Sequence, residues 1–337
     1  MKSSAICIAS PSLALVKYWG KQPDGVNIPA TSSLAVSLGG LDTRTVCRVH
    51  EGGSDRVEID GEVQPESRFA VFFENLRAFM CRTFEFSDTL YHTKDPAALR
   101  FEVTSSNNFP TAAGIASSSS GFAALAGACT AAVGLSSTED ELSALARVGS
   151  GSAARSVFGG FVGLSAGAMH ARQLYPEQHW PELRVLIVIV RRERKPWTSR
   201  DAMESSRHSS PYYSAWVDSS EQEYERGLDA LARRDIRKLG EAARRSYLQM
   251  FGTMLSADPP ILYWTPESVE VIRAAAELRS HGIAAWETMD AGPQVKIITL
   301  SSDVEAVRKL VTEAVPGAEF LVASPGSGLR YEPAATT

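Results

Sequence analysis

The chain has 337 residues, of which 44% are hydrophobic, enough to bury a substantial core in one large domain or two moderate ones. Its formal net charge of -5 argues against a nucleic-acid-binding protein, which needs a basic face. No apolar run approaches the roughly 18 residues of a membrane helix, and the N-terminus lacks the layout of a signal peptide, so we expect a soluble, cytoplasmic protein.

The placement of cysteine and histidine argues against a disulfide framework or a metal centre. Cys7, Cys47, Cys81 and Cys129 are scattered without the CxxC spacing of a zinc site, so we expect reduced, buried thiols. The six histidines show no HExxH spacing, so the sequence predicts no protein-bound metal.

Strand and helix patterns alternate through the N-terminal half. Apolar or alternating runs predict strands at residues 4–8, 43–50, 56–59 and 99–104. Residues 66–84 have helical spacing, and their apolar face is expected in the core: Phe69, Phe72, Phe73, Leu76 and Phe79. A second helix is expected from about Gly114, and a capping box of Thr138 and Glu141 opens a third that runs through Val148. The Gly-rich residues 159–167 predict a strand and a turn.

The sequence of strand and helix patterns begins anew near residue 182, where we place a domain boundary. Residues 183–190 predict an apolar strand, and the charged residues 219–250 predict one or two long surface helices. Thr265 and Pro266 begin another helix, with Gly282 as its C-terminal stop. Strands are then expected at the two segments that flank a helix over 303–315, namely 294–300 and 319–323.

Residues 107–121, NNFPTAAGIASSSSG, form the most informative segment. Small residues and hydroxyls precede a helical pattern, and the free amides and positive dipole end of a helix N-terminus bind phosphate. The segment matches neither GxxxxGK[ST] nor GxGxxG. A Ser-rich linker is the alternative, but linkers do not usually lead into an amphipathic run such as 122–133.

This segment resembles the ATP-phosphate loop of the GHMP kinase superfamily, and most closely that of its decarboxylating branch, the mevalonate diphosphate decarboxylase family. Further segments resemble the family in the same order along the chain: residues 15–21 (LVKYWGK), 149–156 (GSGSAARS), 199–203 (SRDAM) and 289–293 (MDAGP). The resemblance implies an α+β GHMP kinase fold. It places an N-terminal ribosomal-protein-S5-like domain at residues 1–182 and a C-terminal ferredoxin-like α/β sandwich at residues 183–330.

Asp290 lies in a turn between an apolar helix pattern and a strand pattern. An Asp in such a turn commonly hydrogen-bonds its own backbone. The resemblance instead implies the catalytic carboxylate, which orients or deprotonates a tertiary hydroxyl for attack on the γ-phosphoryl group of ATP. The following Gly292 and Pro293 would fix its backbone, which matters because phosphoryl transfer depends mostly on positioning.

Lys17 and Lys21 flank Tyr18 and Trp19 near the end of the first strand pattern. Lysines four residues apart are usually solvated, but these two alternate with aromatic residues in an apolar segment, where a lysine stabilises an anion more strongly. The resemblance implies that Lys17 lies beside the catalytic Asp290, and that Tyr18 and Lys21 hold the terminal phosphates of the substrate.

Arg155 follows a Gly-Ser run, where its planar guanidinium can bind a carboxylate through two hydrogen bonds or brace a carbonyl of the turn. The resemblance implies the first role, in which Arg155 binds the C1 carboxylate that leaves as carbon dioxide.

The other implied substrate contacts are donors to carboxylate or phosphate oxygens: Arg68, Ser150, Ser152, Ser199 and Arg200. The implied nucleotide contacts come from the phosphate loop and the strand before it: Ser105, Asn107, Pro110, Gly114, Ala116, Ser117, Ser118 and Ser119. Among these, Ser118 is the hydroxyl expected on the γ-phosphate, and we count it as catalytic.

The resemblance therefore implies an ATP-dependent decarboxylase that converts mevalonate 5-diphosphate into isopentenyl diphosphate, uses ATP and Mg²⁺, and forms a homodimer. Ser12 and Gln294 stand where the family more often has Asn, so mevalonate 5-phosphate stays an alternative substrate. A kinase that stops at the 3-hydroxyl and a non-catalytic ligand sensor are further alternatives, which the intact Asp290, Lys17 and Arg155 disfavour.

A second motif points to another class of enzyme. Residues 163–167, GLSAG, match the GxSxG of a serine hydrolase. A nucleophile elbow needs a strand before the motif and a helix after it, whereas the flanking pattern here predicts a strand and then a turn. The hydrolase is therefore the weaker hypothesis.

Overall fold

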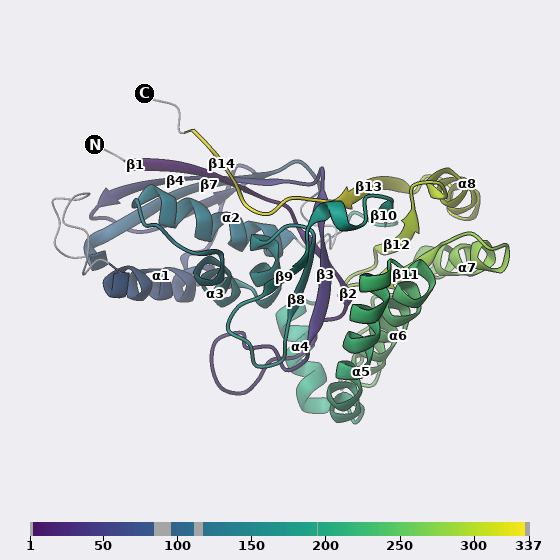
Figure 1. Ribbon diagram of the computed structural model, residues 1–337. Helices are drawn as coiled ribbons and strands as arrows, with labels where there is room; N and C mark the ends of the chain where they lie inside the picture. Colours follow the sequence, from purple (N-terminus) through teal and green to yellow (C-terminus); the bar gives the residue numbers. More distant parts are fainter. Residues whose placement is uncertain (1–2, 84–95, 111–116, 194, 334–337) are drawn as a thin grey trace.

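Two β-sheets organise the part of the chain that the computed structural model describes, which is residues 3–83, 96–110, 117–193 and 195–333 (Figure 1). The first sheet has the strand order β14-β1-β4-β7-β5-β6. Its strands are β1 (Ser3–Ala9), β4 (Thr43–Glu51), β5 (Arg56–Ile59), β6 (Glu62–Val63), β7 (Leu99–Asn107) and β14 (Arg330–Glu332).

The second sheet has the strand order β11-β12-β10-β13-β3-β8-β9, and β2 pairs with β3 off this path. Its strands are β2 (Ser12–Val16), β3 (Ser33–Gly39), β8 (Phe161–Leu164), β9 (Arg172–Tyr175), β10 (Leu183–Ile189), β11 (Trp286–Met289), β12 (Val295–Leu300) and β13 (Glu319–Pro325). Strands from both halves of the sequence meet in this sheet, because Ser324 and Pro325 of β13 pair with Gly39 and Leu38 of β3.

Helices cover both sheets. Those of the first half are α1 (Ala70–Thr83), α2 (Ser117–Ala132) and α3 (Glu139–Gly149), followed by the 3₁₀ turn η4 (Gly151–Val157). Those of the second half are α4 (Ser199–Ser209), α5 (Tyr213–Arg233), α6 (Ile236–Leu255), α7 (Pro266–Ser280) and α8 (Val304–Ala314). In Figure 1, α1 to α3 lie under the first sheet, and α5 and α6 lie beside β2 and β3.

Helix α2 is buried on nearly all sides, between the first sheet and the α3–η4 segment. A helix in such a layer needs small residues around its whole circumference, which explains its Ala-, Gly- and Ser-rich sequence. A Cβ atom at Gly127 would lie 2.6 Å from the Cys7 sulfur, so the close approach of α2 to β1 requires glycine there. This packing fixes the direction of the helix that begins at Ser117.

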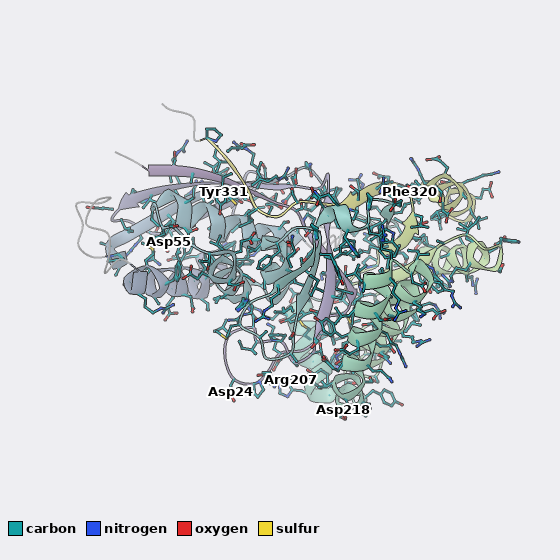
Figure 2. All side chains as sticks on the ribbon, in the orientation of Figure 1. Asp24, Asp55, Arg207, Asp218, Phe320 and Tyr331 are labelled. Carbon is teal, nitrogen blue, oxygen red and sulfur yellow. The ribbon has the colours of Figure 1, made fainter. Side chains whose placement is uncertain are left out.

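The end of the described chain returns to its beginning. Strand β14 pairs antiparallel with β1 at the edge of the first sheet, and Tyr331 hydrogen-bonds the Cys7 side chain from there. Figure 2 labels Tyr331 on this strand and Phe320 on β13, in the other half of the molecule. The division near residue 182 stays a prediction, and both β13 and β14 carry the second half of the sequence across to strands of the first half.

Most of the predicted elements are confirmed. The four predicted N-terminal strands are β1, β4, β5 and β7, and the later ones are β8, β10, β12 and β13. Thr138 caps α3 with the predicted capping box, and Thr265 caps α7 with Pro266 in its first turn. The charged segment forms two helices, α5 and α6, which separate at Arg234, a residue with φ of 54°.

Some predictions need correction. The helix expected over residues 66–84 is a short 3₁₀ turn at Glu66–Arg68 followed by α1, and Phe79 is only half-buried. Cys81 is exposed rather than buried. Lys17 follows β2, a separate strand that the sequence pattern did not identify, because β2 and β3 are buried on both faces and lack the apolar-polar alternation. The expected start at Gly114 lies outside the described residues, within which α2 begins at Ser117.

None of the helices in the described residues is both long enough and apolar enough to span a membrane.

Candidate active site

Asp290 is held between two lysines that come from different strands. Lys17 directly follows β2, and its ammonium donates to the Ala14 carbonyl (2.7 Å) and to Asp290 Oδ1 (2.9 Å). The main-chain amide of Lys17 donates to Ser246 Oγ of α6 (2.9 Å), which ties β2 to the second half of the chain. Lys296 in β12 lies on the other carboxylate oxygen, with 3.2 Å between Nζ and Oδ2. The predicted pairing of Lys17 with Asp290 is therefore present, and Lys296 completes it.

The turn that carries Asp290 is held by contacts to its neighbours. Asp290 directly follows β11, and Ser268 in the first turn of α7 donates its hydroxyl to the Pro293 carbonyl (2.7 Å). Buried Gln294 accepts the Val190 amide (2.7 Å) at the end of β10. The Gln294 side chain thus connects the ends of the paired strands β10 and β12.

The charges around Asp290 determine its ionisation. Burial opposes the charged form, but Lys17 and Lys296 outweigh it and hold the pKa of Asp290 well below its ordinary value. Burial also lowers the pKa of Lys17 to about 8, against the attraction of Asp290. At neutral pH the group is therefore a carboxylate between ammonium ions, with a net positive charge.

Arg155 in η4 is a buried cation that faces this cluster. Its side chain is 1% exposed, and Nη1 donates to Ser33 Oγ of β3 (2.7 Å). Its Nε has no hydrogen-bond partner among the described residues. Burial lowers the pKa of Arg155 to about 10, so the guanidinium stays charged at neutral pH. A buried guanidinium with an open donor is suited to bind an anion such as a carboxylate.

Two tyrosine hydroxyls are buried nearby without a hydrogen-bond partner in the described part of the chain, those of Tyr18 and Tyr213. The Arg155 guanidinium lies 5.9 Å from the centre of the Tyr18 ring, and burial raises the pKa of Tyr18 to about 12. A Cβ atom at Gly151 would lie 2.2 Å from the Tyr18 hydroxyl, and one at Gly20 would lie 1.9 Å from the Tyr213 hydroxyl. These glycines leave the space in which each hydroxyl sits.

Serine hydroxyls gather where α2 begins and α3 ends. Ser118 Oγ, in the first turn of α2, lies 3.5 Å from Ser150 Oγ, which lies 3.1 Å from Ser152 Oγ. Ser12 in β2 donates its amide to Ser119 Oγ (3.2 Å) and its hydroxyl to the Ser152 carbonyl (3.5 Å). The hydroxyl of Ser119 thus contacts β2, whereas Ser118 is exposed at the helix N-terminus, where the amides favour an anion.

The segment before α4 also reaches the Asp290 turn. The ammonium of Lys195 donates to the Ala291 carbonyl (2.7 Å) and to Ser199 Oγ (2.9 Å), the first residue of α4. Burial lowers the pKa of Lys195 to about 8, as does the nearby charge of Lys296, against the attraction of Asp290. The predicted substrate residue Ser199 is therefore connected to the turn of Asp290 through Lys195.

Lys21 and Arg200 form a second basic region. Burial lowers the pKa of Lys21 to about 8, and the positive charge of Arg200 lowers it further, against the attraction of Glu204. Both were predicted to contact substrate phosphates. The effect of Arg200 on the pKa of Lys21 indicates that the two cations lie near each other.

Several predicted residues are engaged elsewhere. Arg68 donates to Gln64 (2.7 Å) and lies over the Phe69 ring. Ser105 Oγ lies 2.9 Å from Thr45 Oγ1 within the first sheet.

The remaining nucleotide predictions concern the end of β7 and the phosphate loop. Asn107 accepts the Thr43 hydroxyl (2.5 Å) and donates its amide to Asp60 (3.0 Å). Pro110 and Ser117 border the part of the loop that holds Gly114 and Ala116, and the latter two lie outside the described residues. The proposed nucleotide roles of all these residues stay predictions.

Sequence reasoning missed Lys195, Lys296 and Tyr213. A charged residue inside an otherwise apolar strand, as in 295–300, is a signal that could have indicated Lys296. Lys195 lies in a basic run that resembles an ordinary surface segment. For Tyr213, a tyrosine at the start of a helix, the sequence contains no comparable signal.

The GxSxG segment does not form a nucleophile elbow. Strand β8 ends at Leu164, Ser165 is exposed, and the chain turns back into β9, which pairs antiparallel with β8. No helix follows the serine before β9, a segment that the structure describes in full. The geometry disfavours a serine hydrolase.

Known proteins with the same features were found by sequence and by structure. The family model for the diphosphomevalonate decarboxylase-like N-terminal domain matches residues 9–174, and that for the mevalonate 5-diphosphate decarboxylase C-terminal domain matches residues 185–326. A diphosphomevalonate decarboxylase from Homo sapiens is 33% identical, over 98% of this chain and 85% of the relative. One from Candida albicans is 31% identical, over 91% of this chain and 87% of the relative.

Solved structures of mevalonate diphosphate decarboxylases are also similar to this chain. The mevalonate diphosphate decarboxylase from Enterococcus faecalis has a TM-score of 0.86 and 33% identity, over 99% of this chain and all of that chain. A structure described as MDDEF in complex with MVAPP, AMPPCP and magnesium has a TM-score of 0.88 and 32% identity, over 99% of this chain and 100% of that chain. The Staphylococcus aureus enzyme has a TM-score of 0.89 and 29% identity, with 99% of each chain covered.

The fold and the carboxylate–lysine site together define a mixed α+β protein of the GHMP kinase fold. The chain belongs to the mevalonate diphosphate decarboxylase family, and it is an enzyme that acts as a decarboxylase.

The three lysines with a pKa near 8 predict a basic limit to activity. Lys17, Lys21 and Lys195 are charged below about pH 8 and lose their charges above it, because each pKa is lowered from 10.5. We expect kcat/KM, which reports the free enzyme, to fall above about pH 8 more steeply than the loss of one proton allows. Initial rates from pH 6 to 10 measure this, and a flat profile up to pH 10 would contradict it.

Proposed function

We propose that this enzyme catalyses the ATP-dependent decarboxylation of mevalonate 5-diphosphate to isopentenyl diphosphate, ADP, phosphate and carbon dioxide. The observation that carries the proposal is the Asp290 carboxylate, ion-paired with Lys17 and Lys296, beside the buried and partly unpaired cation of Arg155. Family membership and the MVAPP and AMPPCP bound by a relative support the choice of substrates.

In the first step Asp290 accepts a hydrogen bond from the 3-hydroxyl group, and that oxygen attacks the γ-phosphoryl group of ATP. The new bond joins the C3 oxygen to phosphorus, the bond to the β-phosphate oxygen breaks, and ADP leaves. Lys17 stabilises the charge near the transferring group. Ser118, at the start of α2, places its hydroxyl and amide for the γ-phosphate.

The low pKa of Asp290 is compatible with this step. A carboxylate held between two ammonium ions is a weak base in the free enzyme. A loose phosphoryl-transfer transition state needs little deprotonation of the nucleophile, because bonding to the attacking oxygen is weak until late. Asp290 therefore first orients the hydroxyl and takes its proton only as the oxygen–phosphorus bond forms.

In the second step the C3–O bond breaks and its electron pair leaves with the phosphate. The electrons of the C1–C2 bond become the C2–C3 double bond, and C1 leaves as carbon dioxide. Arg155 binds the C1 carboxylate before this step and fixes its plane. Because carbon dioxide is neutral, the ion pair with Arg155 is lost on the way to product, so orientation is its main contribution.

The hydroxyl of Ser118, exposed in the first turn of α2, fits an Mg²⁺ ion that is bound to ATP. Mg²⁺ in ATP sites takes most of its oxygens from phosphates and water, which Ser118 and its neighbours would supplement. When bound, it would neutralise charge on the phosphates.

Further properties rest on resemblance to the family and are part of the proposal. These are a homodimeric assembly, a cytoplasmic location, the roles of Tyr18 and Lys21 on the substrate phosphates, and two domains that meet near residue 182.

The test is release of labelled carbon dioxide from C1-labelled mevalonate 5-diphosphate with ATP and Mg²⁺, beside the same assay with the 5-monophosphate. We expect turnover of the diphosphate and little turnover of the monophosphate. Preference for the monophosphate would keep the chemistry and change the substrate. Release from neither, by folded protein that binds ATP, would overturn the proposal.

Asp290→Asn should lower kcat by about 100-fold or more, because the amide cannot accept the proton, while the Kd for an ATP analogue stays unchanged. Phosphate release and equilibrium nucleotide binding measure the two effects. Asp218→Asn, at an exposed position of α5 labelled in Figure 2, is the matched control. Strong residual activity of the Asp290 variant would contradict the mechanism.

Arg155→Lys should lower kcat/KM by about 10- to 100-fold, since it removes at least one charge-assisted hydrogen bond worth about 1.5–3 kcal/mol. The control is Arg237→Lys on the exposed face of α6. An unchanged rate would mean that Arg155 only supports the turn after α3.

A further inference from the structure

We propose that Lys296 is a positioning residue, which holds the second carboxylate oxygen of Asp290 and so fixes the plane of the carboxylate for the attacking hydroxyl. This inference rests on the proposed function, because it concerns the group that orients the 3-hydroxyl. Nothing in the sequence motifs around Asp290 assigns a role to this lysine.

The strand pairing places Lys296 beside Asp290. In the β11–β12 pair, Lys296 lies directly opposite Thr288. Thr288 and Asp290 are two residues apart and so lie on one face at the end of β11, the same face as the side chain opposite Thr288. The β11–β12 register therefore sets the position of Lys296, and the turn directly after β11 places Asp290 Oδ2 3.2 Å from Lys296 Nζ.

Two lysines restrict the orientation of the Asp290 carboxylate more than one lysine can. The terminal torsion of an aspartate is broad, so a single contact at Oδ1 leaves the carboxylate plane free to turn. Lys17 donates a hydrogen bond to Oδ1 and is itself anchored by the Ala14 carbonyl, while Lys296 forms an ion pair with Oδ2, which accepts no hydrogen bond among the described residues. With one buried cation on each oxygen, the plane has a single favourable orientation.

The burial of Lys296 indicates that its charge has a functional role. Its side chain is 2% exposed, in a strand whose other members are mainly apolar. An apolar residue of similar length would pack there without the cost of desolvating an ammonium group, which is often the more stable choice. The charged groups that act on Asp290 come from four elements: Lys17 after β2, Lys296 in β12, Lys195 before α4 and Arg155 in η4.

The experiment compares Lys296→Met with the wild-type enzyme and with Lys309→Gln, an exposed lysine of α8. We expect Lys296→Met to lower kcat about 100-fold and to leave the Kd of an ATP analogue within about twofold. The ¹³C-carboxyl titration of Asp290, assigned by difference from Asp290→Asn, should move up by about one pH unit or more. Lys309→Gln should match the wild type in all three.

Two results would overturn the inference: an unchanged kcat, or a loss of kcat with no change in the Asp290 titration, which a merely structural lysine would give. If Lys296→Met does not fold, the titration is repeated in Lys17→Met. Asp290 then keeps a pKa below its ordinary value if Lys296 holds it, and an ordinary or higher pKa overturns the inference. Should the wild type release no carbon dioxide, the proposed function fails, while the titrations still report on the contact.

Discussion

The carboxylate of Asp290 between two buried ammonium groups is the interaction on which the rest of the site depends. Lys17 comes from the first half of the sequence, and Lys296 and Asp290 come from the second. The Lys17 and Lys296 side chains are 1% and 2% exposed and the Asp290 side chain is 26% exposed, so two desolvated ammonium groups depend on one partly exposed carboxylate. The shared sheet, and the hydrogen bond from the Lys17 amide to Ser246, therefore hold this charged group together as well as the fold.

Around this group the site has more positive than negative charge. Arg155, Lys195 and Lys21 add cations, and buried or half-buried cations are costly unless anions neutralise them. A substrate with a carboxylate and a diphosphate, together with ATP, brings the missing negative charge. The positive excess thus matches the sign of charge on a polyanionic pair of ligands.

Local structural features could be predicted from the sequence, whereas features that depend on strand pairing could not. The capping box that begins α3 involves residues three apart and was predicted correctly, as was the start of α7 at Thr265 and Pro266. Lys17 and Asp290 were paired only through resemblance to a family, since 273 residues separate them. Lys296 was missed because its closeness to Asp290 follows from the β11–β12 register, and β2 was missed because burial on both faces removes its alternation.

The pairing of β14 with β1 has a consequence for how the chain is made. Strand β1 is synthesised well before its second neighbour β14, because all the other strands and helices lie between them in the described sequence. Until β14 arrives, an edge with unpaired amides and carbonyls remains open beside a nearly complete sheet, and such edges promote aggregation. The nascent chain therefore has an interval of exposure that ends only when β14 has been synthesised, and during this interval a chaperone has most to protect.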